Sequence, residues 1–377
     1  MIASPLPLPT RVEVTEGPAL LRGVGRGASL AAHRQQYGDL AHPNLAELDD
    51  ALAGVDLRGR GGAGFPFLVK LRTTAMSRGR SVVVVNLAEG EPASAKDHAL
   101  ATTRPHLLLD GAVLVARALG TKEVHVVVPA DRPAVEQAIR VAVGERRERF
   151  RVHTSAARFT SGQSSAVLEL MAGRQGLPVT TWTPSARSGH RGRPTLLANA
   201  ETWAQVALLM HDLRSYGAGT RLLTLVGTRG GHRVVEVALG SRLGEAIGAE
   251  RLRHPALLGG FHGAWATPDD LATMTVSTGL GAGVVLSLTD GECPGDVTRQ
   301  ITRYLAGQSA GRCGPCRNGL PALASALEDG DPLRADELQR QVDGRGACAH
   351  PDGTARLVRS LLTTFPGCLR AHEAVAT

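Results

Sequence analysis

The chain has 377 residues, of which 43% are apolar and only 3% aromatic, and its formal net charge is +7. This length predicts two or three domains, with cores built mainly from Leu, Val and Ala. The arginines are scattered among acids, and rings on which bases could stack are scarce, so we expect no nucleic-acid binding. No apolar stretch is long enough to span a bilayer, and the amino terminus does not resemble a signal peptide. We therefore expect a cytoplasmic protein without a direct membrane span.

The first half of the chain alternates predicted strands and helices. Residues 1–45, rich in Pro, Gly and Arg, are expected to form an N-terminal arm. Continuous β-branched runs at 81–86 and 123–129 predict buried parallel strands. Helices are predicted at 45–55, from 65–66 onward, at 105–119 and at 131–147, the last capped by Asp131. This alternation is typical of a layered α/β domain, which we place at 46–215.

The second half changes character. Short β-like runs at 221–228, 232–239 and 282–288, with one helix near 242–247, predict a small α+β domain at 216–292. Helical periodicity then returns at 297–305, 320–327, 335–342 and 354–362. We therefore expect a small helical domain at 293–377, which carries the clustered cysteines.

The most informative motif is the stretch LRGRGGAGFP at residues 57–66. Gly59, Gly61, Gly62 and Gly64 let backbone amides approach an anion, and such successive amides form a partly positive nest. Arg58, Arg60 and Lys70 are expected to add full charges. A standard dinucleotide fingerprint needs a strand before the loop, whereas a helix is predicted here. The motif thus indicates a phosphate site at the start of a helix, and a mobile glycine-rich turn is the structural alternative.

Two further motifs carry chemical groups. The sequence NLAEGEP at 86–92 follows a buried strand, which places Asn86, Glu89 and Glu91 where ligands of open α/β sheets bind, although an acidic turn is the simpler reading.

The cysteines form the other motif. Cys313 and Cys316 form a C-x-x-C, and Cys348 lies in a glycine-rich turn. Three thiolates indicate an iron-sulfur cluster, or a zinc ion with His350 as fourth ligand, and buried inert thiols are the third reading. Cys293 and Cys368 are expected to be structural.

Taken in order, the glycine loop, NLAEGEP, GRPT through Asn199 and Thr202, and SAGRCGPCRNG form a series. The series resembles the NADH-binding flavoprotein subunit of respiratory complex I and its relatives in hydrogenases and formate dehydrogenases, over residues 51–375. The resemblance implies an FMN-binding, Rossmann-like α/β domain, a ubiquitin-like α+β domain of the SLBB type, and a C-terminal helical bundle with a [4Fe-4S] cluster.

The resemblance also implies roles for individual residues. The family's FMN contacts fall on Gly59, Arg60, Gly61, Lys70, Asn86, Glu89, Gly162, Asn199 and Thr202. Phe65 and Glu91 match its nicotinamide contacts, and Cys313, Cys316 and Cys348 match cluster ligands.

The chain also departs from the family pattern. Gln163 and Ser164 replace two carboxylates, Phe159 replaces a tyrosine, and residues 180–184 (TTWTP) replace Lys-Pro-Pro-Phe-Pro, so NAD(H) binding is left open. Ala310 replaces one cluster cysteine, which leaves a variant cluster with three thiolates.

These implications define the expected activity. The resemblance implies an NADH dehydrogenase-like oxidoreductase that passes electrons from NAD(P)H through FMN to an iron-sulfur cluster. The expected acceptor is a ferredoxin-like or reductase subunit, through which the chain would be peripheral to a membrane. One alternative is an FMN and iron-sulfur relay that a partner protein reduces. The other is a zinc-stabilised module that binds a partner without catalysis.

Overall fold

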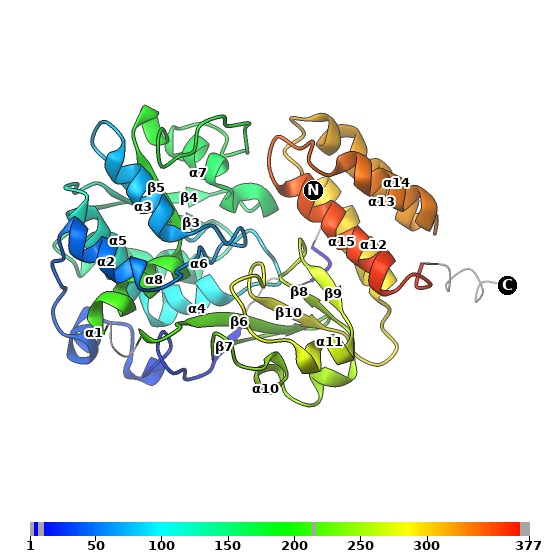
Figure 1. Ribbon diagram of the computed structural model, residues 1–377, viewed down its shortest axis with the longest axis horizontal. Helices are drawn as coiled ribbons and strands as arrows, with labels where there is room; N and C mark the ends of the chain where they lie inside the picture. Colours follow the sequence, from blue (N-terminus) through cyan, green and yellow to red (C-terminus); the bar gives the residue numbers. More distant parts are fainter. Residues whose placement is uncertain (1–3, 7–10, 213–215, 370–377) are drawn as a thin grey trace.

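A computed structural model describes residues 4–6, 11–212 and 216–369 of the chain. Its first half contains a four-stranded, fully parallel sheet (Figure 1). The strand order is β4 (Phe150–Ser155), β3 (Val124–Pro129), β2 (Val82–Asn86) and β5 (Thr195–Asn199). Every residue of β2 and β3 is buried, as expected for a parallel sheet that is covered on both faces.

Helices cover the two faces of this sheet. One face shares a large core with α2 (Leu45–Ala53), α3 (Phe67–Met76), α4 (Lys96–Thr103), α5 (Pro105–Ala118), α6 (Pro133–Gly144) and α8 (Ala200–His211). The other face packs against α7 (Ser164–Met171). Because side chains alternate along a strand, Val83 and Val85 enter the first core while Val82 and Val84 enter the second.

The second sheet has six strands and includes part of the N-terminal arm. Its order is β1 (Val12–Val14), β7 (Gly230–Ala238), β6 (Thr220–Gly227), β10 (Val284–Ser287), β8 (Ala256–Leu258) and β9 (Ala264–Ala266). Strand β1 pairs in parallel with β7, so the arm is anchored on this sheet. Helices α10 (Leu243–Ile247) and α11 (Pro268–Thr273) belong to the same part of the chain.

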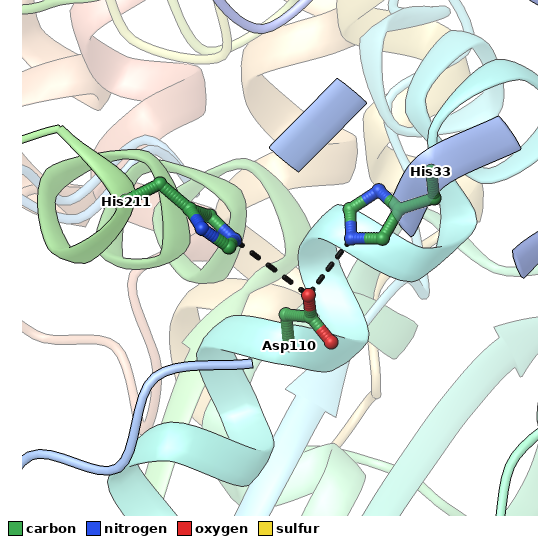
Figure 2. Close-up of side chains that lie close together, drawn as sticks. All are labelled: His33, Asp110 and His211. Carbon is green, nitrogen blue, oxygen red and sulfur yellow. Dashed lines mark hydrogen bonds and ion pairs between the residues drawn. The ribbon is translucent and has the colours of Figure 1, made fainter. Parts of the chain in front are cut away.

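The arm is also held by a buried carboxylate, Asp110 on α5. Figure 2 shows His33, from α1 (Leu30–Tyr37), and His211, from α8, pointing at the same oxygen of Asp110, at 2.8 and 3.7 Å. Arg34 and Arg146 donate to Asp110 at 2.8 and 2.7 Å. Burial would raise the pKa of Asp110, but the neighbouring histidines, the hydrogen bonds from Arg34 and the charge of Arg146 together hold it far below its ordinary value. This network therefore joins the arm to two core helices.

The C-terminal helices lie beside the second sheet at the right of Figure 1. They are α12 (Pro294–Gly307), the π-helical turn η5 (Pro315–Gly319), α13 (Leu320–Glu328), α14 (Pro332–Val342) and α15 (His350–Thr364). They share a core with strand residues such as Leu257 and Leu286. Within the described ranges, no helix is long and apolar enough to cross a membrane.

The structure confirms the predicted α/β class, the two predicted strands of the first sheet and the C-terminal helices. The prediction that Asp131 caps α6 is wrong, because Arg132 occupies the cap position and makes no side-chain capping bond. The sequence analysis did not predict β4, β5 or α8, and it assigned no helix or strand to the arm. The predicted domain limits stay predictions, and the limit after 215 follows directly on residues 213–215, which lie outside the described part.

Candidate functional site

The glycine-rich segment forms a closed loop between α2 and α3. The Gly59 amide donates to the Phe65 carbonyl at 2.9 Å, and Arg58 and Pro66 form an isolated bridge, which closes the loop at its base. Gly62 and Gly64 have φ values of +99° and +61°, where a side chain would be strained. A Cβ on Gly61 would contact the Cβ of Asn199 at 3.4 Å. The loop therefore lies against the carboxyl end of β5.

The loop borders a cavity of about 90 Å³, at the carboxyl ends of β2 and β5. Most of the predicted FMN residues line it, together with the predicted nicotinamide contact Phe65: Gly59, Gly61, Gly64, Lys70, Asn86, Gly162, Asn199 and Thr202. Sequence reasoning missed Ala63, Phe67, Ser164, Leu197 and Ala198, which also line it. The cavity is smaller than the ~300–1,000 Å³ of typical ligand pockets. Phe65 lies at its edge and is 47% exposed, so this ring is free to move outward.

Lys70 supplies the cavity with a cation that has no counter-ion. Its amine donates to the Leu197 carbonyl at 3.3 Å, and no carboxylate of the described residues pairs with it. Its Nζ also lies 5.8 Å from the centre of the Phe65 ring. Burial lowers the pKa of the Lys70 amine. An anionic group in the cavity would remove this desolvation cost, so the donor set fits the phosphate or reduced ring of a flavin.

The other two predicted charges of the loop are directed elsewhere, which corrects the expectation that they add charge to the anion site. The Arg60 side chain is buried, donates to the Thr220 carbonyl at 3.0 Å, and lies 3.9 Å from Glu201. Arg58 pairs with Asp56 at 2.8 Å. Arg60 thus joins the loop to β6, and its backbone amide, bonded to the Thr202 hydroxyl at 3.0 Å, holds the loop on α8.

A buried network of polar side chains holds the Asn199 side chain in place. Lys96 donates to Asp97 at 2.7 Å and to the Asn199 side-chain oxygen at 2.8 Å, and lies 3.3 Å from Glu201. Asn199 in turn donates to Asp97 at 2.5 Å. Burial raises the pKa of Asp97 to about 6. Because these side chains bond to one another, the network fixes the Asn199 side chain at the cavity wall.

The predicted acidic contacts Glu89 and Glu91 do not line this cavity. Glu89 pairs with Arg132 at 2.7 Å and borders a second cavity of about 410 Å³, which also reaches Ser161, Tyr304 and Gln308. Glu91 accepts bonds from the Ala93 and Phe261 amides at 3.1 and 2.8 Å. Burial raises the pKa of Glu91 to about 7. In this conformation Glu91 therefore fastens the α/β part to the turn between β8 and β9.

The cysteines lie at the start of the C-terminal helices. Cys316 is buried, and Cys313 and Cys348 are half-buried. Burial is the main reason that the pKa of the Cys316 thiol rises to about 12, and the Cys313 and Cys348 thiols raise it further. The three thiols are therefore neighbours. Yet within the described ranges they do not form a group of three ligand atoms within 4.8 Å of one another. Tetrahedral zinc, with Zn–S bonds of about 2.3 Å, brings its thiolates to within about 4 Å. The three thiols as described are therefore not arranged around a single zinc ion.

His350 cannot complete this site in the described conformation, which corrects the prediction of a fourth ligand. Its Nε2 lies 2.8 Å from the Leu305 carbonyl and its Nδ1 lies 3.2 Å from His262 Nε2. Burial raises the pKa of the Cys348 thiol, and the nearby His350 backbone and Gln163 side chain oppose this shift. Cys293 and Cys368 lie beside each other at Gly295, away from the C-x-x-C, as expected for structural cysteines.

Comparison with known proteins identifies the family. Residues 52–208 match the model of the Nuo51 FMN-binding domain, and residues 296–372 match the NADH-ubiquinone oxidoreductase-F iron-sulfur binding region. A subunit of the NADH-quinone oxidoreductase of Streptomyces coelicolor is 30% identical over 84% of this chain and 81% of its own length. The corresponding subunit of Aquifex aeolicus is 25% identical over 85% and 84%.

A solved structure shares the fold. An NAD+-reducing [NiFe]-hydrogenase chain in the H2-reduced state superposes with a TM-score of 0.80 at 23% identity, over 95% of this chain and 67% of that one. The chain belongs to the family of NADH-quinone oxidoreductase subunits that combine the Nuo51 FMN-binding domain with the iron-sulfur binding region.

Proposed function

We propose that the chain accepts electrons from NADH on FMN bound at the glycine loop and passes them to an iron-sulfur cluster held by Cys313, Cys316 and Cys348. The observation that carries the proposal is the closeness of the two sites. Gly162 lines the glycine-loop cavity, and the side chain of the next residue, Gln163, lies close enough to the Cys348 thiol to influence its pKa. A flavin and a cluster placed there would be separated by one short stretch of backbone.

The chain's residues have distinct tasks in this proposal. FMN, when bound, converts a two-electron donor into a one-electron supply. The amides of 59–64 and the Lys70 amine bind and balance its negative charge. Asn86 donates to the Gly162 carbonyl at 2.8 Å and so fixes the cavity wall. We further propose that Glu91 leaves the turn at Phe261 and faces the nicotinamide when NADH binds.

The electron acceptor is proposed to be a ferredoxin-like or reductase partner subunit. Its support is that relatives of this chain are named as subunits of NADH-quinone oxidoreductases and that a structural neighbour belongs to a hydrogenase. The zinc-stabilised module is not favoured, because residues 296–372 match an iron-sulfur binding region and the three thiols are not arranged around a single zinc ion.

Anaerobically purified protein, loaded with FMN, tests the proposal. We expect iron and acid-labile sulfide in the protein, flavin absorbance, and NADH-dependent reduction of an artificial acceptor. Flavin and iron without reduction by NADH would support the relay fed by a partner. Zinc without sulfide would contradict both electron-transfer functions.

A further inference from the structure

A second group of metal-type ligands lies at the end of the parallel sheet that is opposite to the glycine loop. Glu123 precedes β3, His125 lies in β3, and His190 lies in the turn His190–Gly192 before β5. Their ligand atoms all lie within 4.8 Å of one another. His125 Nε2 lies 3.1 Å from Glu123 Oε1. His125 and His190 are only 1% and 3% exposed, so the group is largely withdrawn from water.

His190 shows that the group lacks a partner. Its Nδ1 is buried, and no hydrogen-bond partner for it exists among the described residues. A buried imidazole nitrogen without a partner is costly, because it has lost water and gained nothing in exchange. A cation bound by His190 through Nδ1, together with His125 and Glu123, would supply the missing partner and remove the cost of burying this nitrogen.

His153, on β4, is placed to orient His125. His125 Nδ1 lies 2.8 Å from His153 Nε2, and the two rings stack at an interplanar angle of 8°. Without a metal, His125 Nε2–H donates to the Glu123 carboxylate, and His125 Nδ1 accepts from His153 Nε2. A metal bound at Nε2 would take the place of this proton, and His125 Nδ1–H would then donate to His153. Metal-ligating histidines usually have such a partner on the other ring nitrogen.

The contact between Arg193 and the Glu123 carboxylate leaves room for a metal ion on the same carboxylate. Arg193 pairs with both oxygens of Glu123, at 2.7 and 2.8 Å. A carboxylate offers about four lone-pair sites, of which Arg193 takes two. Ligating carboxylates are commonly held by such a second contact.

The group around Asp110 provides a contrast. His33, Asp110 and His211 also bring their ligand atoms within 4.8 Å (Figure 2). There, however, Arg34 and Arg146 both donate to the carboxylate, and Arg146 is buried with it. Two guanidinium groups neutralise Asp110 and would repel a divalent ion. This group is therefore a structural ion-pair network.

We propose that Glu123, His125 and His190 bind a divalent cation of the zinc type, with His153 as a positioning residue, at a site separate from the cysteines. Two imidazole nitrogens and one carboxylate oxygen form a three-ligand set that zinc uses with a fourth position open. Imidazole nitrogen is also a good ligand for Co²⁺ and Ni²⁺, whereas Mg²⁺ and Ca²⁺ prefer oxygen.

Cobalt titration of the full chain, with its cluster in place, tests the site. Co²⁺ bound by nitrogen and oxygen gives visible d–d bands without the thiolate charge-transfer band that cysteine ligands produce. We expect one Co²⁺ per chain with the nitrogen and oxygen spectrum, displaced by Zn²⁺ and not by Mg²⁺. Bound metal should also raise the melting temperature.

Matched variants locate the bound ion. His190→Gln should abolish the bands and the thermal shift, whereas His211→Gln, in the contrasting group, should keep both. Because a change at a buried position can disturb folding, Glu123→Gln serves as a second variant at a half-exposed residue, with binding weakened at least tenfold. Unchanged bands in His190→Gln and Glu123→Gln, bands lost equally in His211→Gln, or only a thiolate spectrum in the wild type would overturn the proposal.

Discussion

The Gln163 side chain lies near the Cys348 thiol, where it opposes the rise in pKa that burial causes, and the residue before it, Gly162, lines the glycine-loop cavity. Gln163, which differs from the family pattern, therefore lies between the two proposed redox sites. The family pattern has a carboxylate where this chain has Gln163. A neutral amide can donate to a thiolate, whereas a carboxylate would repel it.

The position of the Gln163 amide, as a hydrogen-bond donor beside Cys348, predicts an effect on the cluster's reduction potential. Hydrogen bonds to cluster sulfurs stabilise the reduced, more negative state. Removing one in Gln163→Ala should lower the potential by roughly 40 mV for each ~1 kcal/mol of lost interaction in a one-electron couple. A redox titration followed by electron paramagnetic resonance measures the shift. Gln163→Glu should lower the potential further, and equal potentials in all three proteins would show that the bond is unimportant for the cluster.

Lys70 predicts an effect on flavin affinity. A charge-assisted bond is worth about 1.5–3 kcal/mol, so Lys70→Ala should weaken FMN binding roughly 10–100-fold. Quenching of flavin fluorescence on titration with protein measures the dissociation constant. Arg72→Ala is the matched control, because Arg72 lies on the same helix, is 54% exposed and pairs with Asp49. Equal affinities in the wild type and Lys70→Ala would place the flavin elsewhere.

Asp110 predicts a large effect on stability. Removing the carboxylate in Asp110→Ala leaves the buried Arg146 with Glu148, 3.3 Å away, as its remaining ion-pair partner. Removal of one member of a buried ion pair typically costs about 3–5 kcal/mol. Chemical denaturation should show this loss in the free energy of unfolding. Asp56→Ala, at a side chain that is 67% exposed, should change it by less than about 1 kcal/mol. Similar losses in the two variants would contradict the structural role of the network.

The buried Glu91 carboxyl predicts that the free energy of unfolding depends on pH. Burial raises the pKa of Glu91 from 4.5 to about 7 in the folded protein. A carboxyl with a raised pKa stabilises the fold fully below its unfolded value, and this contribution is lost as the pH rises through the folded value. Between pH 5 and pH 8 the wild type should therefore lose roughly 1–3 kcal/mol more than Glu91→Gln. Parallel curves for the two proteins would show that Glu91 is ionised across this range.

The sequence predicted most of the elements that have a clear period or a continuous apolar run. The valine run of β2 and the helix after Pro66 are local signals, and the structure confirms both. Strand β5 was missed because Pro194 and the preceding polar turn hide a run of only five residues, Thr195–Asn199. Strand β1 has only three residues and is stabilised by pairing with β7, more than 200 positions away, which no local pattern reveals.

The candidate site was predictable only in part, for the same reason. Glycines at 59–64 need positive φ or close approach, and motif spacing reveals this. The direction of Arg60 is set by Glu201 and Thr220, so a charge beside the loop was misread as a ligand contact. The missed residues Ser164 and Leu197 reach the cavity through the packing of α7 and β5. Both lie in segments that the motifs cover, but the motif pattern does not mark either residue as a contact.

The most direct test of electron transfer between the two sites is anaerobic electron paramagnetic resonance of FMN-loaded protein mixed with NADH. We predict the signal of a reduced iron-sulfur cluster, which requires added FMN and is diminished in Lys70→Ala at limiting FMN. Bleaching of the flavin without any cluster signal, or a cluster signal that forms equally well without FMN, would contradict this account.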